Sequence, residues 1–198
     1  MSPAATGPAG VVLVLHGGQG ASTGPTSPVQ LAVLRMIPLA RAIAAAVPRG
    51  VQVRRPRFGV RGWNGPYASP VGDLERWLDA ITVPVVLVGH SMGARAALRA
   101  AGPPQVVGVA GLAPWLPPGE PFTQLAGRAV LLAHGDRDTT TSPAQTWAFA
   151  ELARTVTDVT TVSVAGGEHA MLRHARAWHR LAADFAAAAF SLRPGAPR

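Results

Sequence analysis

Residues 85–98 read Val85-Val86-Leu87-Val88-Gly89-His90-Ser91-Met92-Gly93-Ala94-Arg95-Ala96-Ala97-Leu98, and they hold the clearest structural signal in the chain. The aliphatic run at 84–88 predicts a buried strand, and the Ala- and Arg-rich segment after Ser91 predicts a helix. Between them, the Gly-x-Ser-x-Gly pattern predicts a turn so sharp that the serine takes a strained backbone conformation. Gly89 and Gly93 lack a Cβ, so strand and helix can approach closely. The hydroxyl of Ser91 would then stand above the sheet, at a helix N-terminus that favours a developing negative charge.

Length and composition indicate a single globular domain covering residues 1–198, since 48% of the residues are hydrophobic and 14% are charged. Residues 1–10 and 191–198 are expected to be loose tails. The net charge is +8 and every basic residue is Arg, but no Arg run or nucleic-acid module is recognisable, so we expect no nucleic-acid partner. Seven arginines and no acidic residue precede Asp73. We interpret this as a solvated Arg face, with a surface attractive to an anionic substrate as the alternative.

Several classes of site are excluded by residues that the chain lacks. Cysteine is absent, which excludes disulfides, thiolate catalysis and Cys-based zinc sites. Lysine is absent, which excludes a phosphate-binding loop, and residues 18–23 lack the third glycine of a dinucleotide fingerprint. No His-x-x-x-His or Glu-x-x-His pair falls at a strand end. We therefore expect no cofactor and no metal.

The segments that target proteins to membranes are also not recognisable. The first ten residues contain no basic region, and the apolar run at 11–15 is too short for a signal peptide. No apolar stretch approaches the length of a membrane span. We expect a cytoplasmic protein with no membrane partner.

Six apolar segments predict strands, at residues 11–15, 51–55, 84–88, 105–110, 129–133 and 159–164. Helical patterns lie between and after them, at residues 29–47 with a kink or break at Pro38, at 71–81, after Ser91, at 143–155 and at 170–190. This alternation predicts an α/β fold, doubly wound, with a mainly parallel six-stranded sheet and helices on both faces. The first strand is expected inside the sheet, and 51–55 and 159–164 are expected at its edges.

Three side chains that together could form a nucleophile, a base and an orienting acid follow three of these strands. Ser91 follows the third strand, Asp138 the fifth and His169 the sixth, and sites in such sheets lie beyond the carboxyl ends of the strands. A serine is a poor nucleophile unless a base takes its proton, and a carboxylate orients that base. Ser, then Asp, then His is the chain order expected for such a triad on this fold. Asp136 is the alternative acid, although it could instead hold the turn or pair with Arg137.

The remaining histidines receive other interpretations. His169 is favoured as the base because Gly166 and Gly167 precede it and a helix is expected directly after it. Packing or a supporting role is expected for those in the strand-end turns, and a place within the last helix for the other two: His16, His90 and His134 in the first group, His174 and His179 in the second.

An oxyanion hole requires two backbone N–H groups that face the developing charge. Met92 is expected to supply one, because it follows the nucleophile. The turn after the first strand is expected to supply the other, from Gly18 or alternatively from Gln19. The competing interpretations are that Ser91 only caps a helix and that His16-Gly17-Gly18 is an ordinary glycine turn.

The chain resembles the α/β-hydrolase superfamily over roughly residues 11–190. The resemblance is carried by four motifs in order: Leu15-His16-Gly17-Gly18, Gly89-His90-Ser91-Met92-Gly93, His134-Gly135-Asp136-Arg137-Asp138 with Ser142-Pro143, and Gly167-Glu168-His169. It is closest in kind to small carboxylesterase-like members. Two features depart from larger members: the two antiparallel strands that usually open the fold are not found, and a short Pro-rich loop at 113–121 stands where a helical cap would be inserted. The resemblance implies a shallow site open to water, and Gln19, Trp63, Trp115 and Met171 are candidates for contact with substrate.

The leading hypothesis is a serine hydrolase that cleaves a small or extended carboxylic ester or thioester through an acyl-serine intermediate. An acyltransferase or perhydrolase would use the same triad. The hypotheses from other classes are a non-catalytic binding protein on the same fold and an Arg-driven polyanion binder. A small-molecule acyl substrate is the expected partner, and the oligomeric state is left open by the sequence.

Overall fold

Six strands form one sheet in which neighbours in the order β2-β1-β3-β4-β5-β6 are hydrogen-bonded. The computed structural model describes residues 7–191. The strands are β1 (Gly10–Leu15), β2 (Val51–Arg54), β3 (Val85–His90), β4 (Val106–Leu112), β5 (Ala129–Gly135) and β6 (Val159–Val164). Every pairing is parallel, so the predicted sheet is confirmed, with β1 inside it and β2 and β6 at its edges. β3, β4 and β5 each extend two residues beyond the predicted ends, toward the candidate site.

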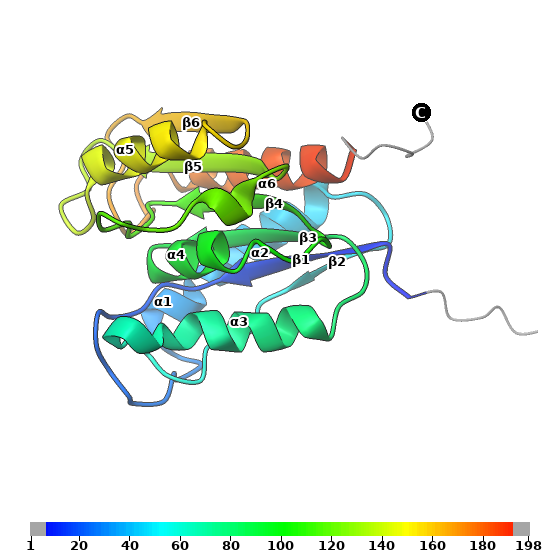
Figure 1. Cartoon of the computed structure of the whole chain (residues 1–198), viewed down its shortest axis with the longest axis horizontal. Coiled ribbons are helices and arrows are strands. Elements are labelled where there is room, and N and C mark those ends of the chain that lie inside the picture. Colours follow the sequence, from blue (N-terminus) through cyan, green and yellow to red (C-terminus); the bar gives the residue numbers. More distant parts are fainter. Residues whose placement is uncertain (1–6, 192–198) are drawn as a thin grey trace, which may run out of the picture.

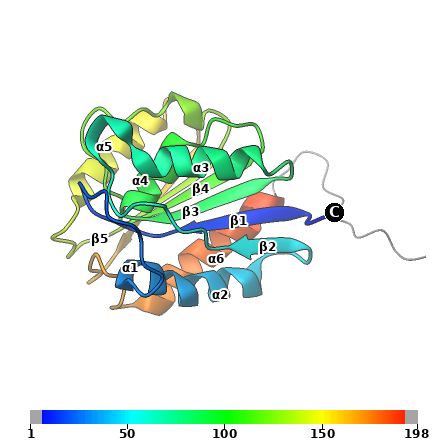
Figure 2. The ribbon, with the colours of Figure 1, turned by 90° about the horizontal axis from the view of Figure 1, so that it is seen from below.

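Helices cover both faces of the sheet, which Figure 2 shows edge-on between its two helical layers. One face carries α3 (Ser69–Asp79), α4 (Met92–Arg99) and α5 (Pro143–Ala153), and the other carries α1 (Leu31–Leu34), α2 (Met36–Ala46) and α6 (Ala175–Ser191). Two short 3₁₀ turns lie in loops, η1 (Gly65–Tyr67) and η2 (Thr123–Leu125). Alternate side chains of each strand point to opposite faces, so the sheet contributes side chains to two separate hydrophobic cores. Both faces are therefore dry, as expected for parallel strands.

The order in which the chain adds strands to the sheet reverses between the neighbouring strands β1 and β3 (Figure 1). After β1 it crosses by α1 and α2 to the edge strand β2, and after β3 it crosses by α4 to β4 on the opposite side. The loops after β1 and β3 consequently leave toward opposite faces and open a crevice at the carboxyl edge of the sheet. Sites in doubly wound sheets lie at such switch points.

Two predicted helices differ from the structure by more than a shift of two residues at their ends, which is the extent of the difference for α3 and α5. The helix expected at 29–47 breaks at Arg35 and not at Pro38. Pro38 is the third residue of α2, where a backbone N–H has no acceptor within the helix, so its missing N–H costs nothing. The last helix begins at Ala175 and not at residue 170. Met171 and His174 have φ of 55° and 57°, a conformation that no α-helix accepts.

Two further observations concern the boundaries of the fold. Gly10 opens β1 and Ser191 ends α6, so neither belongs to a loose tail. Residues 1–6 and 192–198 of the predicted tails fall outside the described residues. The connection between β4 and β5 contains only η2, and no helical insertion stands there. Within residues 7–191, no helix combines the length and the apolar character needed to cross a bilayer.

Candidate active site

Ser91 occupies a strained turn between β3 and α4. Its φ and ψ are 55° and −119°, outside the regions that L-residues favour. The flanking glycines leave no room for a side chain: a Cβ on Gly89 would lie 2.4 Å from the carbonyl oxygen of Gly93, and one on Gly93 would lie 2.5 Å from that of His16. The Ser91 side chain makes no capping hydrogen bond to α4. The residue pattern is thus required by close packing, and the serine hydroxyl is available for another contact.

That contact is with His169, which in turn contacts Asp138. Ser91 Oγ lies 3.1 Å from His169 Nε2, and His169 Nδ1 lies 2.8 Å from Asp138 Oδ2. An ionised carboxylate only accepts hydrogen bonds, so the Nδ1–H of His169 donates to Asp138 and its Nε2 can accept from the serine hydroxyl. Ser91 and Asp138 are each 8% exposed, whereas the His169 side chain is 17% exposed. The structure therefore brings together three residues separated by up to 78 positions in the sequence.

Asp138 is surrounded by donors. Its Oδ1 accepts the backbone N–H groups of Thr140 and Thr141 at 2.8 and 2.9 Å, and its Oδ2 accepts the Thr141 hydroxyl at 2.9 Å. Burial acts to raise the pKa of Asp138, but the hydrogen bonds from Thr141, His169 and Thr140 outweigh it and hold the pKa below its usual value. The carboxylate is consequently ionised at neutral pH.

Asp136 has a different position. It is exposed, and its Oδ1 accepts the backbone N–H of Gly166 at 2.7 Å. It thereby ties the turn after β5 to the loop that carries His169. Of the two acids weighed from the sequence, Asp138 is the one in contact with the imidazole.

Thr141 is the polar residue of this site that the sequence interpretation missed. Its hydroxyl lies 2.9 Å from Asp138 Oδ2 and 3.1 Å from His169 Nδ1. The available signal was the run of three threonines directly after Asp138, because a hydroxyl a few residues beyond a carboxylate commonly bonds back to it.

His90 lies beneath the His169 loop. Its Nε2–H donates to the backbone carbonyl of His169 at 2.8 Å, and the two rings are 4.9 Å apart. Burial, followed by the proximity of His169, lowers the pKa of His90 to about 3. A neutral ring under the loop thus fixes the backbone of His169, a supporting role consistent with its position in the strand-end turn.

His16 and the last two histidines lie away from the reacting atoms. The Nε2 of His16 accepts the Phe58 N–H at 3.1 Å and its Nδ1–H donates to the Gly17 carbonyl at 2.7 Å, so it packs the turn after β1. His179 lies within α6 as predicted. His174 does not, because α6 begins one residue later.

The loop after β1 is held by the loop after β2. The N–H of Gln19 donates to the Arg61 carbonyl at 2.8 Å, and the N–H of Trp63 donates back to the Gln19 carbonyl at 2.9 Å. The N–H groups of Gly18 and Met92 donate to no other group within residues 7–191. Gly18 also abuts Met92, since a Cβ on it would lie 2.3 Å from Met92 Cε. These two N–H groups are therefore free to serve a ligand, whereas that of Gln19 is occupied.

A cavity of about 180 Å³ lies beside the serine. It is lined by Gly18, Gln19, Gly20, Ser91, Met92, Trp115, Thr140 and Thr141. Two of the predicted substrate contacts, Gln19 and Trp115, are among these residues.

Trp63 and Met171 are not brought to this cavity. Trp63 is 2% exposed and packs edge-to-face against Trp115, with ring centroids 6.1 Å apart. The guanidinium of Arg95 lies 3.8 Å from the Trp63 ring and 4.5 Å from the Trp115 ring. Trp63 therefore supports the cavity wall from behind. Met171 is 4% exposed and belongs to the core on the α2 and α6 face.

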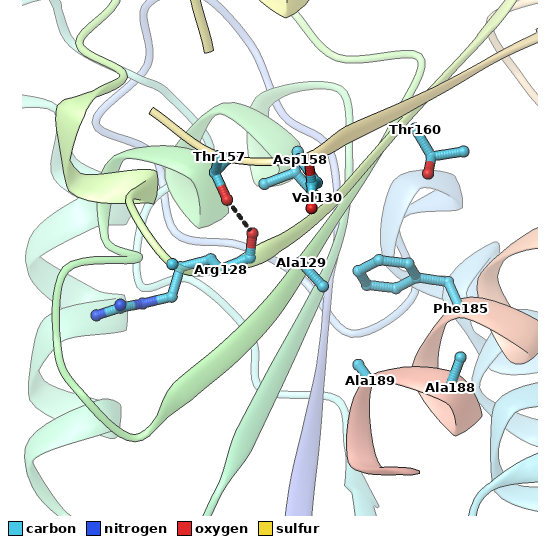
Figure 3. A pocket seen from close by; sticks show the side chains of 10 residues that line it. Arg128, Ala129, Val130, Thr157, Asp158, Thr160, Phe185, Ala188 and Ala189 are labelled. Atoms are coloured by element: carbon cyan, nitrogen blue, oxygen red, sulfur yellow. Dashed lines mark hydrogen bonds between the residues drawn. The ribbon is translucent and has the colours of Figure 1, made fainter. Parts of the chain in front are cut away.

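Another cavity, of about 430 Å³, lies at the amino ends of the strands, away from Ser91 (Figure 3). Its lining comes from the amino ends of β5 and β6 and from α6, and includes Thr157, Asp158 and Phe185. No histidine lines it, and it is separated from Ser91 by the length of the strands. Its larger volume does not make it the reactive site.

No group of three or more His, Asp or Glu side chains that could hold a metal ion occurs in the described part of the chain.

A family model described as "Alpha/beta hydrolase family" matches residues 11–198. The chain belongs to the α/β-hydrolase family. A search of curated protein sequences gave no significant match. The resemblance inferred from the four motifs is thus confirmed at the level of the family.

Solved structures of other α/β-hydrolases share the fold. A lidless α/β serine hydrolase from Xanthomonas campestris aligns with a TM-score of 0.63 at 21% identity, covering 99% of this chain and 88% of its own. A serine hydrolase homologue from Coxiella burnetii gives 0.66 at 19% identity, covering 92% and 87%. A monoacylglycerol lipase from Paleococcus ferrophilus gives 0.67 at 17%, covering 92% and 96%. At these identities the likeness concerns the fold alone.

Proposed function

We propose that this α/β-hydrolase cleaves small carboxylic esters or thioesters through an acyl-serine intermediate. The observation that carries the proposal is the continuous hydrogen-bonded chain from Ser91 through His169 to Asp138, beside an open cavity. A hydroxyl, an imidazole and an ionised carboxylate in this order form the arrangement that activates a serine for acyl transfer.

In the first half of the reaction, Ser91 Oγ attacks the acyl carbon while its proton passes to His169 Nε2. The tetrahedral intermediate then collapses, the bond to the leaving oxygen or sulfur breaks, and His169 returns the proton to the leaving group. In the second half, His169 takes a proton from water as the water oxygen attacks the acyl-serine, and the carboxylic acid departs as Ser91 is reprotonated. Asp138 orients the imidazole and stabilises its charged form.

The oxyanion of each tetrahedral intermediate would be bound by the N–H groups of Gly18 and Met92. Two features support this assignment: both donors are free within the described residues, and Gly18 abuts Met92. Gln19 is a weaker candidate because its N–H already donates to Arg61. Met92 also stands at the first position of α4, where the helix dipole favours negative charge. Removing one such donor typically costs about 10²- to 10³-fold in kcat.

The cavity limits the acyl group. Its volume of about 180 Å³ is below the roughly 300–1,000 Å³ typical of small-molecule sites. Trp115 bounds it on one side, and Thr140 and Thr141 contribute polar surface. We therefore expect short acyl chains to be preferred over long ones. Within residues 7–191 no helical insertion covers the site, so water reaches it readily, which favours hydrolysis over transfer to another acceptor.

The proposal is tested with an activity-based probe and a series of esters. A fluorophosphonate should label the wild-type protein and not Ser91→Ala, and hydrolysis of p-nitrophenyl acetate and butyrate should exceed that of octanoate. Labelling or turnover that survives Ser91→Ala would refute the proposed nucleophile. If all esters and thioesters remain intact and the probe does not react, a binding protein on the same fold becomes the better account.

A further inference from the structure

A second histidine contacts the acid of the triad. His134 is fully buried near the end of β5, and its Nε2 lies 3.1 Å from Asp138 Oδ2, the same oxygen that receives His169. Its Nδ1 lies 2.7 Å from the hydroxyl of Thr146 on α5. Both ring nitrogens therefore have partners, and neither partner is solvent.

The partners determine which nitrogen carries the proton. Nε2 of His134 also lies 3.3 Å from the Thr141 hydroxyl, but that hydroxyl donates its one hydrogen to Asp138 Oδ2 at 2.9 Å. An ionised carboxylate can only accept, so Nε2 of His134 carries the hydrogen that points at Asp138. Nδ1 then presents its lone pair, which accepts the Thr146 hydroxyl hydrogen at 2.7 Å in preference to the Ser142 carbonyl, 3.4 Å from the same hydroxyl. The ring is held in one tautomer between two elements of the fold.

We propose that His134 is a positioning residue for the triad acid: its neutral ring donates a second imidazole N–H to Asp138 Oδ2. This inference rests on the proposed hydrolase function. The donated hydrogen bond keeps the carboxylate from rotating away from His169. It also disperses negative charge on Oδ2, so that Asp138 binds the charged form of His169 less strongly than an isolated carboxylate would.

The electrostatic surroundings are consistent with a neutral donor. Burial lowers the pKa of His134 and outweighs the opposing effect of Asp138, so that a charged ring is disfavoured at neutral pH. The other titratable groups that face the triad are His90 under the loop, with Arg35 within electrostatic reach of it, and the Glu168–Arg173 pair at the surface. None of these donates to Asp138 Oδ2 within the described residues.

The test compares two substitutions of His134. His134→Phe keeps a ring but removes the donor, whereas His134→Gln keeps an amide N–H at the position of Nε2. In His134→Phe the acidic limb of the kcat/KM profile should move up by about 0.5–1 pH unit, because the loss of one hydrogen bond leaves the carboxylate more basic. Activity at pH 6 should fall by about 3- to 10-fold relative to wild type. In His134→Gln the limb should stay in place.

Thr146→Val supplies a packing control, because it disturbs the other side of the ring and leaves the Nε2–H donor. An unshifted limb in His134→Phe would overturn the proposal. Equal shifts in His134→Phe, His134→Gln and Thr146→Val would also overturn it, since packing and not the donor would then be responsible.

A second measurement does not depend on turnover. In ¹⁵N NMR spectra of the wild-type protein between pH 5.5 and 8, His134 should be neutral with its proton on Nε2. A proton on Nδ1, or protonation of both nitrogens within this range, would refute the inference even if esters are hydrolysed. Conversely, absence of Ser91-dependent hydrolysis would refute the proposed function, and the NMR result would still decide whether His134 donates to Asp138.

Discussion

Gly18→Ala is expected to abolish most of the hydrolytic activity without unfolding the protein. A Cβ at this position would lie 2.4 Å from the Arg61 carbonyl oxygen and 2.3 Å from Met92 Cε, and real Cβ contacts essentially never fall under 3.0 Å. The flexible Met92 side chain can turn away. The Arg61 carbonyl is backbone and accepts the Gln19 N–H, so either it or Gly18 must move by about 0.6 Å or more.

Such a movement is large on the scale of catalysis. Donors of an oxyanion hole act at 2.7–3.1 Å, and the loss of one costs about 2.7–4 kcal/mol of transition-state stabilisation, or roughly 10²- to 10³-fold in kcat. The substrate carbonyl gains its charge only in the transition state, so we expect KM to change much less than kcat. Strain in the folded state should add about 1–3 kcal/mol of destabilisation.

The assay is steady-state hydrolysis of p-nitrophenyl acetate, with urea denaturation to verify folding. Gly20→Ala is the matched control in the same loop, because a Cβ there meets only Trp115 Cη2 at 3.8 Å. Its kcat should stay within about threefold of wild type. The reasoning would be refuted if folded Gly18→Ala kept wild-type kcat, or if Gly20→Ala were equally impaired.

Three further predictions concern the wall of the cavity, a buried ion pair and a buried histidine. Trp115→Ala should open the cavity and move the optimum of a p-nitrophenyl ester series toward longer acyl chains; an unchanged optimum would show that Trp115 does not limit chain length. Glu120→Gln should destabilise the fold by about 3–5 kcal/mol in urea denaturation, because the Arg95 guanidinium, paired with it in the interior, would lose its counter-charge. His90 takes up its proton at about pH 3 when folded and near its ordinary value of 6.5 when unfolded, so the unfolded state binds more protons between these values. Stability should therefore fall as pH is lowered through this window, by up to about 1.4 kcal/mol per pH unit from this residue. The fall should be shallower in His90→Gln, and parallel stability curves for the two proteins would contradict this account.

The fold and the three central residues were predictable because each has a local signature. The strands inside the sheet are buried on both faces and were located from continuous apolar runs, whereas the edge strands were located from shorter or alternating patterns at 51–55 and 159–164. The elbow was also predictable from its two glycines, Gly89 and Gly93. The structure gives the physical reason for them, because it leaves no space for a Cβ at either position. Ser91, His169 and the pair Asp136 and Asp138 could be chosen because each follows a strand, and parallel strands end at the same edge of the sheet.

Other features had no local signature. The segment 170–174 has the composition of a helix, yet it must turn to set His169 over the sheet, and two residues there have positive φ. Trp63 lies in a loop and was a candidate for contact with substrate, but it packs behind the cavity against Arg95 and Trp115. Nothing in the local pattern around His134 indicates that its ring shares an oxygen with His169.

The sequence by itself determined the alternation of strands and helices, the elbow at Ser91 and the order of the three polar residues along the chain, because these depend on periodicity and on the space available to individual residues. Only the tertiary structure showed that Asp138 and not Asp136 contacts the imidazole, that the N–H of Gln19 is occupied whereas that of Gly18 is not within residues 7–191, and which residues line the cavity. These outcomes depend on side-chain directions and on hydrogen bonds between loops distant in sequence. Such contacts form only after the sheet has brought the loops to one edge.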